Sequence, residues 1–244
     1  MTFSIAAIDP ETGKNGIAIS SATIVVGAQC PFVGEHGAVS SQSFGSGRSY
    51  GQNAVEMLDR GISLQVACRA LLDEQEGASY TQLHGIDRDG QQFVYTGADC
   101  IDWAGHTTGE ECTAAGNMLD GEQVVEAMVE TFESTDAAFE ERLLTALEAG
   151  EEAGGDKRAG AESEEAFTHE EDEGALESAA LLVYSPEPKL YHNLRIDCST
   201  ESISELHELY DVARELSEEL PELADEYWGK GAYPEEILVN DVKF

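Results

Sequence analysis

Thr2 is the residue whose type and position suggest chemistry most directly, because a small hydroxyl residue follows the initiator methionine. The initiator methionine is usually removed before a residue as small as threonine. Its removal leaves a threonine with a hydroxyl and a free α-amine, which are the nucleophile and the base of a self-contained catalytic residue. The alternative is that Met1 is retained and that Thr2 is an ordinary strand start.

The residues around Thr2 predict a rigid support for it. Residues 2–8 alternate as in a strand, with Phe3, Ile5 and Ala7 on one face and Thr2, Ser4 and Ala6 on the other. Residues 9–13 have the composition of a turn, and residues 16–21 resume the strand pattern, so the segment predicts a β-hairpin. Asp9 is then either a turn former or a group that orients the N-terminus.

The rest of the chain predicts further strands and helices in alternating groups. Strands are expected at residues 38–44, 80–86, 92–95, 176–184 and 189–196. Helices are expected at residues 50–60, 63–74 and 137–149, and beginning near residues 121 and 202. Residues 96–116 are expected to form a long Gly-rich loop, after which Asp120 and Gln123 suit a capping box. This order predicts one antiparallel α+β domain over residues 1–244, with helices layered on stacked sheets.

Charge is the most unusual property of the composition. The 244 residues include 49 acidic and 13 basic side chains, and five of the basic residues are lysines. In concentrated salt, screening acts within a few ångströms and an acidic surface costs little self-repulsion. We interpret the excess of acids as the adaptation of a halophile's protein, and residues 150–175 as an acidic flexible loop. The lack of a basic stripe argues against nucleic-acid binding.

The cysteines and the hydropathy pattern indicate where the protein works. Five cysteines occur at unrelated spacings, which favours reduced thiols and gives no support to a zinc or iron–sulfur site. No apolar run approaches the ~18 residues that a membrane-spanning helix needs. We therefore expect a cytoplasmic protein with no membrane partner, no metal and no cofactor.

Short stretches spread over the chain resemble, in their order, those of a known family. They are Met1-Thr2-Phe3-Ser4-Ile5, Val26-Gly27, Gly37-Ala38-Val39, Ser41-Gln42, Tyr50-Gly51, Thr96-Gly97, Trp103-Ala104-Gly105-His106, Gly116-Asn117-Met118-Leu119, Gly154-Gly155-Asp156-Lys157-Arg158, Ser178-Ala179-Ala180-Leu181-Leu182 and Leu194-Arg195-Ile196-Asp197. Through them, residues 1–210 resemble a widespread family of uncharacterised Ntn-hydrolase-like proteins. The resemblance implies the four-layer αββα fold of the proteasome β subunits and no established substrate.

The resemblance also implies roles for particular residues. In Ntn hydrolases the N-terminal residue attacks an amide carbonyl and its own α-amine takes the proton, so both roles fall to Thr2. An α-amine has a reference pKa of about 7.7–8.0, so part of it is unprotonated near neutrality. Candidate oxyanion donors are Asn117 and the backbone amides near Ser40 and Ser41. His106 either donates to the substrate or closes a loop, and substrate-binding residues are expected to be Ser41, Gln42, Trp103 and Asp9.

The chain departs from the family pattern in four places. The family commonly has Lys or Arg after the second strand, where this chain has Ala22. A cation there lowers the pKa of the amine and stabilises the oxyanion in related hydrolases, so this departure bears on catalysis. The family has an Asn before Tyr-Gly, where this chain has Ser46-Gly47-Arg48-Ser49. It has an Arg before Gln, where this chain has Thr81-Gln82, and Asp-His after the last strand, where this chain has Cys198-Ser199.

Three functions stay open from the sequence. The leading hypothesis is an amide (C–N bond) hydrolase that acts on a small molecule or peptide, with Thr2 as nucleophile and base. The second is a non-catalytic Ntn-fold module for binding or assembly, and the third is a hydrolase that uses an internal group. Because layered folds of this kind often pack through their helices, a homodimer or higher homo-oligomer is expected.

Overall fold

The N-terminal hairpin is present as the alternation predicts. The structure is a computed structural model, and it describes residues 2–44, 49–74, 76–156 and 175–228. Strands β1 (Thr2–Asp9) and β2 (Lys14–Ser21) pair antiparallel. The carboxylate of Asp9 accepts hydrogen bonds from the backbone N–H groups of Glu11 and Thr12, at 3.0 and 3.4 Å. The interpretation of Asp9 as a turn former is therefore confirmed.

The hairpin lies inside a six-stranded antiparallel sheet with the order β10-β9-β2-β1-β8-β7. The other four strands are β7 (Ala104–Thr108), β8 (Cys112–Asn117), β9 (Glu177–Tyr184) and β10 (Asn193–Ser199). Strand β1 thus has a neighbour on each side, and Thr2 lies opposite Asn117 in the β1–β8 pair.

The predicted loop over residues 96–116 is wrong, because β7 and most of β8 lie within it. Small residues occupy this part of the sheet where neighbours approach closely. A Cβ atom at Gly116 would lie 2.3 Å from Leu119 Cδ1, and one at Gly105 would lie 2.5 Å from the indole of Trp103. The crowding requires glycine, and the resulting composition is that of a loop.

The second sheet has four antiparallel strands in the order β3-β4-β5-β6. Its strands are β3 (Pro31–Gly34), β4 (Gly37–Gln42), β5 (Gln82–Asp87) and β6 (Gln92–Thr96), of which β3 was not predicted. Helices α1 (Ser49–Asp59) and α2 (Leu64–Glu74) follow β4 and pack on this sheet. Short 3₁₀ turns lie at Val26–Ala28, Ala78–Tyr80 and Leu190–His192.

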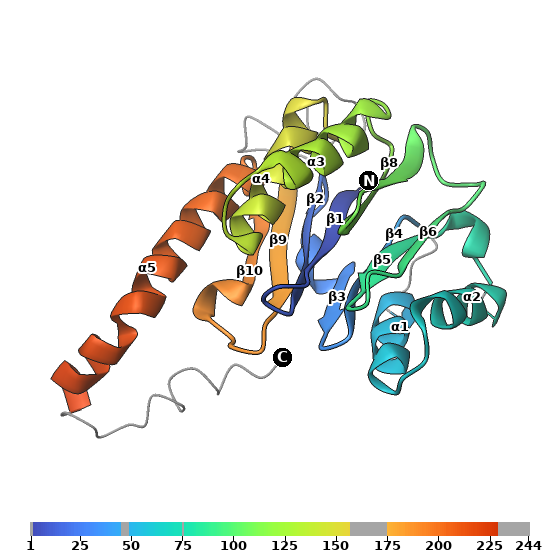
Figure 1. Cartoon of the computed structure of the whole chain (residues 1–244). Coiled ribbons are helices and arrows are strands. Elements are labelled where there is room, and N and C mark those ends of the chain that lie inside the picture. The colour runs from blue at the N-terminus through green and yellow to red at the C-terminus, as the bar shows by residue number, and fades with distance from the viewer. Residues whose placement is uncertain (1, 45–48, 75, 157–174, 229–244) are drawn as a thin grey trace.

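Helices α3 (Gln123–Ser134), α4 (Phe139–Glu152) and α5 (Ser202–Trp228) pack against the six-stranded sheet. Figure 1 shows α5 extending well past the end of the sheet. The predicted capping box is wrong, because the Gln123 side chain donates to the Asp120 carboxylate and to the carbonyl oxygen of Ala153, whereas the Asp120 N–H donates to the carbonyl oxygen of Gly155. The predicted acidic loop at 150–175 begins later than expected, since α4 includes residues 150–152, and residues 157–174 lie outside the described part.

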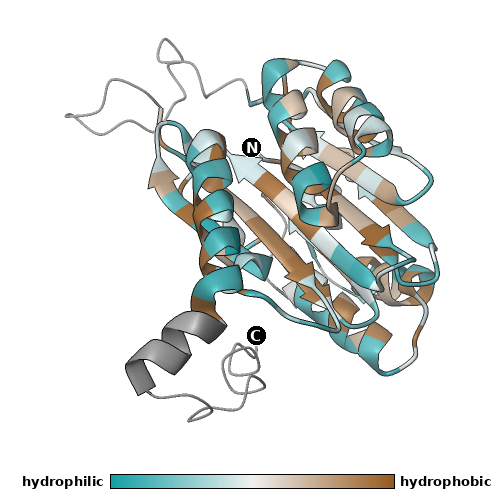
Figure 2. Cartoon of the chain, turned by 60° about the vertical axis from the view of Figure 1, so that its left-hand side comes forward, coloured by the Kyte–Doolittle hydropathy of each residue, from teal (hydrophilic) through white to brown (hydrophobic). Residues whose placement is uncertain are grey.

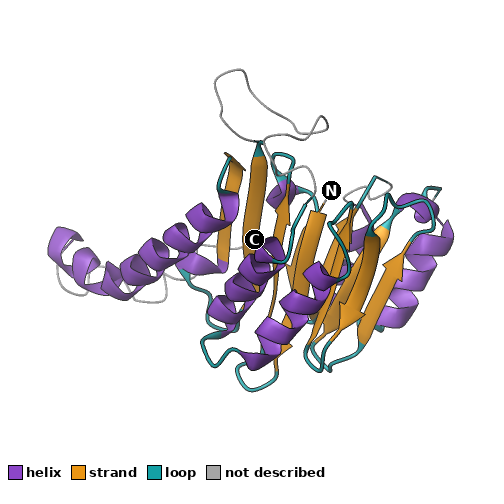
Figure 3. Ribbon diagram, turned by 90° about the horizontal axis from the view of Figure 1, so that it is seen from above, coloured by secondary structure: helices purple, strands orange, loops and turns teal. Residues whose placement is uncertain are grey.

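The two sheets face each other, and each outer face is covered by helices, so the layers run helix, sheet, sheet, helix (Figure 3). One core lies between the six-stranded sheet and its helices and includes Phe3, Ile5 and Leu143. A second core, around Tyr50 and Leu83, lies under α1 and α2. Many residues within the strands are apolar, while polar and apolar residues alternate along α5 (Figure 2). The described residues form a mixed α+β structure with two antiparallel sheets and five α-helices.

Candidate functional site

The layer between the two sheets is divided into an apolar half and a polar half. The apolar half holds the buried cluster Ala6, Ile8, Ile17, Ile19, Val26, Ala38, Ile86 and Ala180. The polar half lies at the end of the sandwich where β1 begins, and its side chains are almost fully buried: Thr2, Ser4, Ser21, Ser40, Gln42, Gln82, His84, Thr113 and Asn117. Burial of so many polar groups is favourable only when they are hydrogen-bonded to one another.

Two glutamine side chains link the sheets in the polar half. Gln82 Nε2 donates to the carbonyl oxygens of Gly105 and Gly116, at 2.9 and 2.8 Å, and to Thr96 Oγ1 at 2.9 Å. Because backbone carbonyls only accept, these bonds orient the amide and turn Gln82 Oε1 toward the centre of the layer. That oxygen accepts from Gln42 Nε2 at 2.7 Å and from Asn117 Nδ2 at 3.2 Å.

Gln42 is oriented in the same way. Its Nε2 also donates to the carbonyl oxygen of Thr2 at 3.4 Å and to that of Ala115 at 3.2 Å. Its Oε1 accepts from the hydroxyls of Ser4 and Ser40, at 2.7 and 3.0 Å. Gln42 is completely buried and bonded to protein groups at both ends of its amide. The amide therefore supports the start of β1 from the facing sheet.

Both ring nitrogens of His84 contact hydroxyl groups of the polar half. Ser4 Oγ lies 2.7 Å from His84 Nε2 and also 2.7 Å from Gln42 Oε1. His84 Nδ1 lies 2.9 Å from Thr113 Oγ1. Burial, with a smaller contribution from His106, lowers the pKa of His84 to about 3. His84 is a neutral, fully bonded core histidine.

Thr2 lies at the first position of β1, in the polar half, and is 5% exposed. Its Oγ1 donates to Ser21 Oγ at 3.2 Å. Residues opposite each other in an antiparallel pair have Cβ atoms about 4.5–5.5 Å apart, so the side chain of Asn117 lies beside that of Thr2. The structure thus brings Thr2, Asn117 and Gln42 into one hydrogen-bonded group.

His106 is at the margin of this group. It lies on β7, an edge strand, where it is exposed and where the sequence predicted a loop. Its Nδ1 is 2.9 Å from Thr96 Oγ1, and Thr96 in turn accepts from Gln82. Burial of part of the ring lowers the pKa of His106. His106 therefore joins the group through Thr96 without contacting Thr2.

The other three predicted site residues lie elsewhere. Ser41 is opposite Leu83, on the face of the small sheet that carries the α1–α2 core, and its N–H donates to the carbonyl of Cys30. Trp103 packs against the core on the helix side of the six-stranded sheet. Asp9 ends β1, whereas Thr2 begins it.

Near Thr2, the helix side of the six-stranded sheet is acidic. The backbone N–H of Ala22, where the family commonly has a cation, donates to Asp156 Oδ2 at 3.0 Å. Asp156 lines a cavity of about 80 Å³ together with Glu151 and Glu177. Burial, reinforced by Glu151, raises the pKa of Glu177 to about 7. This cavity also contacts Phe3 and Ser20, on the helix side of the sheet.

Sequence reasoning missed Gln82 and Ser4 as parts of the site. Gln82 lies on the same face of β5 as the apolar Ile86, and Ser4 lies on the same face of β1 as the apolar Ala6. A polar residue on a strand face that is otherwise apolar was the sequence feature that could have identified each of them. Within the described ranges, no group of three or more His, Cys, Asp or Glu could hold a metal ion. No described helix is long and apolar enough to cross a membrane.

Comparisons with known proteins extend over most of the chain. Residues 2–206 match the model of a family of unknown function, DUF1028. The crystal structure of protein SPO2555 from Silicibacter pomeroyi, which carries the same family model, is 33% identical and superposes with a TM-score of 0.75. The match covers 87% of this chain and 85% of that chain. No curated protein matches. The predicted resemblance to an uncharacterised family is confirmed to this extent.

Proposed function

The chain belongs to the DUF1028 family, a family of unknown function, and we propose that it hydrolyses an amide bond in a small molecule or peptide with Thr2 as the nucleophile. The observation that carries the proposal is the placement of Thr2 beside Asn117, whose amide Gln82 orients. The helix–sheet–sheet–helix layering supports an Ntn-hydrolase-like fold, in which the first residue of the mature chain is the nucleophile.

The proposed reaction begins after Met1 has been removed. The free α-amine of Thr2 takes the hydroxyl proton, and Oγ1 bonds to the substrate carbonyl carbon. The tetrahedral intermediate collapses with cleavage of the C–N bond, and the leaving amine receives the proton from the α-ammonium group. Water then hydrolyses the ester on Thr2 by the same base, which restores the hydroxyl and releases the acid.

Asn117 is the proposed oxyanion donor. Its amide nitrogen carries two hydrogens, and within the described residues one hydrogen bond, to Gln82 Oε1, uses one of them. The second hydrogen is available to an oxygen that develops charge next to Thr2. Gln82 is then a positioning residue. The bonds that its Nε2 donates to Gly105 and Gly116 turn its Oε1 toward the Asn117 amide.

The α-amine of Thr2 is the proposed base. Among the hydrogen bonds and ion pairs of the described residues, none joins Thr2 to a Lys, Arg or His side chain. With an amine pKa of about 7.7–8.0, the rate should rise as the pH increases through this range and then level off.

The proposal is tested by intact mass and by an acylating probe. Mass spectrometry of the natively produced protein should show loss of Met1. A β-lactone probe should then add its mass to Thr2 by opening on Oγ1, more rapidly at pH 8.5 than at pH 6.5. Thr2→Ala should abolish labelling, and Thr2→Ser should retain it.

A matched control is Thr81→Ala. Thr81 is a completely buried threonine whose hydroxyl bonds to the carbonyl of Gly77, outside the polar half. Its loss should leave labelling of Thr2 unchanged. Full retention of Met1, or equal labelling of the Thr2→Ala variant, contradicts the proposal.

The rival function is a non-catalytic module for binding or assembly. One observation favours it: Gln42 and Gln82 are saturated with protein partners and are completely buried. Such a module should show ligand-dependent increases in Tm that survive Thr2→Ala. A homo-oligomer, which either function accommodates, stays a prediction that light scattering can check.

A further inference from the structure

A cavity opens at the end of the sandwich opposite Thr2. Its volume is about 220 Å³, which equals the share of about seven water molecules in the liquid. Its walls come from the end of β1 (Ile8), the β3–β4 turn (Glu35), the β5–β6 turn (Arg88) and the end of β9 (Tyr184). Since β1 has eight residues, the cavity is about 23 Å from Thr2 and forms a separate site.

Among the described residues, two basic side chains of this acidic chain line the cavity, and one of them is already engaged. Lys14 Nζ lies 2.9 Å from Glu140 Oε1, and His192 Nε2 lies 2.9 Å from the same oxygen. Burial raises the pKa of Glu140, but the bonds from His192 and Lys14 outweigh burial and hold it at about 2. The ammonium of Lys14 is thus fixed to a buried carboxylate.

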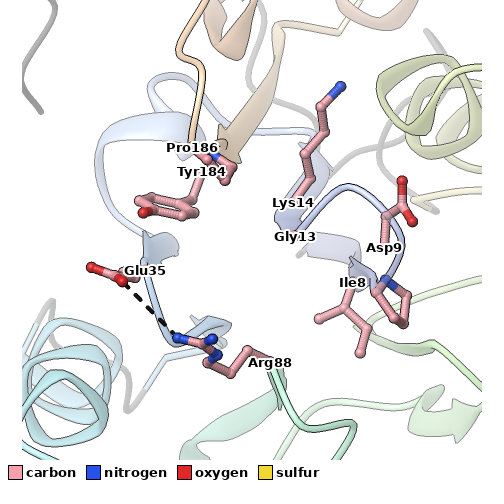
Figure 4. A pocket seen from close by; sticks show the side chains of 9 residues that line it. Ile8, Asp9, Gly13, Lys14, Glu35, Arg88, Tyr184 and Pro186 are labelled. Atoms are coloured by element: carbon pink, nitrogen blue, oxygen red, sulfur yellow. Dashed lines mark ion pairs between the residues drawn. The ribbon is translucent and has the colours of Figure 1, made fainter.

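Arg88 is the basic residue that a ligand can engage. Its Nη1 is 4.0 Å from Glu35 Oε1, and the two side chains are 55% and 59% exposed. Exposed pairs at this distance contribute little, so a ligand can displace Glu35 at low cost. Figure 4 shows Tyr184, Glu35 and Arg88 along one side of the opening and Ile8 on the other, with the Lys14 ammonium turned away from Arg88.

Tyr184 supplies a second donor and a flat wall. No hydrogen bond to its hydroxyl occurs in the described part of the chain. Burial, followed by the charge of Glu35, raises the pKa of Tyr184, so the hydroxyl keeps its proton. The remaining walls include the apolar side chains of Ile8 and Pro186.

We propose that this cavity binds a small organic carboxylate with an apolar body. The Arg88 guanidinium matches a carboxylate through two parallel N–H donors, and the Tyr184 hydroxyl donates to the same group. The body of the ligand lies against Ile8 and Pro186. A monoanion fits better than phosphate, because Glu35 and a formal net charge of −36 repel a second negative charge.

The first experiment compares ligands that differ only in their head group, with the full chain at fixed salt and pH 7. Hexanoate, hexanamide, hexylammonium and inorganic phosphate are titrated separately while the NMR signals of the protein are followed. Hexanoate should bind saturably, and the other three at least about tenfold more weakly, because only hexanoate offers a monoanionic carboxylate to the guanidinium.

The second experiment uses variants of the cavity. Arg88→Gln should weaken hexanoate binding at least about tenfold, and Tyr184→Phe about threefold, while Glu35→Gln should tighten it about threefold by removing the competing carboxylate. Arg60→Gln is the matched control, since Arg60 is 74% exposed and pairs with Glu56 at 3.9 Å on α1. Thr2→Ala should also leave binding unchanged.

Three outcomes overturn the proposal. They are the absence of saturable hexanoate binding, equal affinity for hexanoate and hexanamide, and unchanged affinity in the folded Arg88→Gln variant. Preferred binding of phosphate would contradict the choice of a monoanion and overturn it as well.

Discussion

The two halves of the inter-sheet layer are built from the same strands by different means. Along one face, β1 runs from Ser4 to Ala6, and β5 runs from His84 to Ile86. The apolar half is held by contact area, which any side chain of similar volume supplies. The polar half is held by directed bonds, such as the 2.7 Å bond between Gln42 and Gln82, which each require one partner at one place. The apolar half therefore tolerates exchange of its side chains, whereas the polar half depends on each one.

This difference has a consequence for strand register. A slip of β1 by one residue would put Phe3 in the place of Ser4 and leave both Gln42 and His84 without their partner. In the apolar half, the same slip would exchange one apolar side chain for another. The polar half therefore fixes the register that places Thr2 opposite Asn117.

The largest expected effect follows from removing the central amide. Gln82→Leu removes the side-chain partner of the Gly105 and Gly116 carbonyls and of the Asn117 amide, and buries an apolar group beside them, while Gln42 keeps its bonds to the carbonyls of Thr2 and Ala115. We expect a loss of about 4 kcal/mol in the free energy of unfolding, because each buried unsatisfied group costs about 1–3 kcal/mol. Urea denaturation at fixed salt measures it.

Ile86→Val is the counterpart in the apolar half. Ile86 lies on the same strand and is completely buried, and its loss of one methylene should cost about 1 kcal/mol. If Gln82→Leu proves no more destabilising than Ile86→Val, the distinction between the two halves fails.

A smaller effect, which depends on pH, comes from His84. Its pKa is about 3 in the folded chain against an ordinary value of 6.5. Between these values the unfolded chain binds a proton that the folded chain does not, so this contribution is complete above pH 6.5 and falls as the pH drops toward 3. The loss between pH 7 and pH 5 should be about 2 kcal/mol.

His84→Gln removes this contribution and leaves the other titrating groups in place. The free energy of unfolding of the variant should therefore decrease less between pH 7 and pH 5 than that of the parent protein. Equal decreases in the two proteins would show that His84 is not held neutral.

The smallest effects compare one exchange made in both directions. Ser4→Ala deprives Gln42 and His84 of a partner, and Ala6→Ser, two residues along the same face, buries a hydroxyl among apolar side chains. Each should cost about 1–1.5 kcal/mol. Thermal unfolding of the two variants checks this, and a neutral result for Ser4→Ala would show that the network adapts to the loss.

Much of the fold was predictable because it rests on local patterns. The alternation of residues 2–8, the Asp-Pro turn and the apolar periodicity of the helices gave correct elements with ends shifted by a few residues. Strands β7 and β8 escaped prediction because close approach of Leu119 and Trp103 requires glycine at Gly116 and Gly105. Such strands are stabilised by tertiary contacts that their own composition does not display.

The candidate site was predictable only in part. Thr2 and Asn117 were identified singly, and the structure places them side by side through the β1–β8 register, which no short-range pattern specifies. Gln82 stood in the sequence next to the departure at Thr81, but its bonds to Gly105, Gly116 and Thr96 depend on the packing of two sheets. Asp9 and Ser41 were grouped with Thr2 by resemblance, yet they lie at another end and on another face.

The burial of β1 on both faces bears on how this chain diverges over evolutionary time. Residues 2–8 are all buried, the odd positions against helices and the even ones against the second sheet. A strand with one solvated face accepts neutral drift at every second position, whereas β1 has no such position. An exposed position on the edge strand β7, such as Thr108, is free to vary. Mutational tolerance should thus be lowest in the segment with which the chain begins.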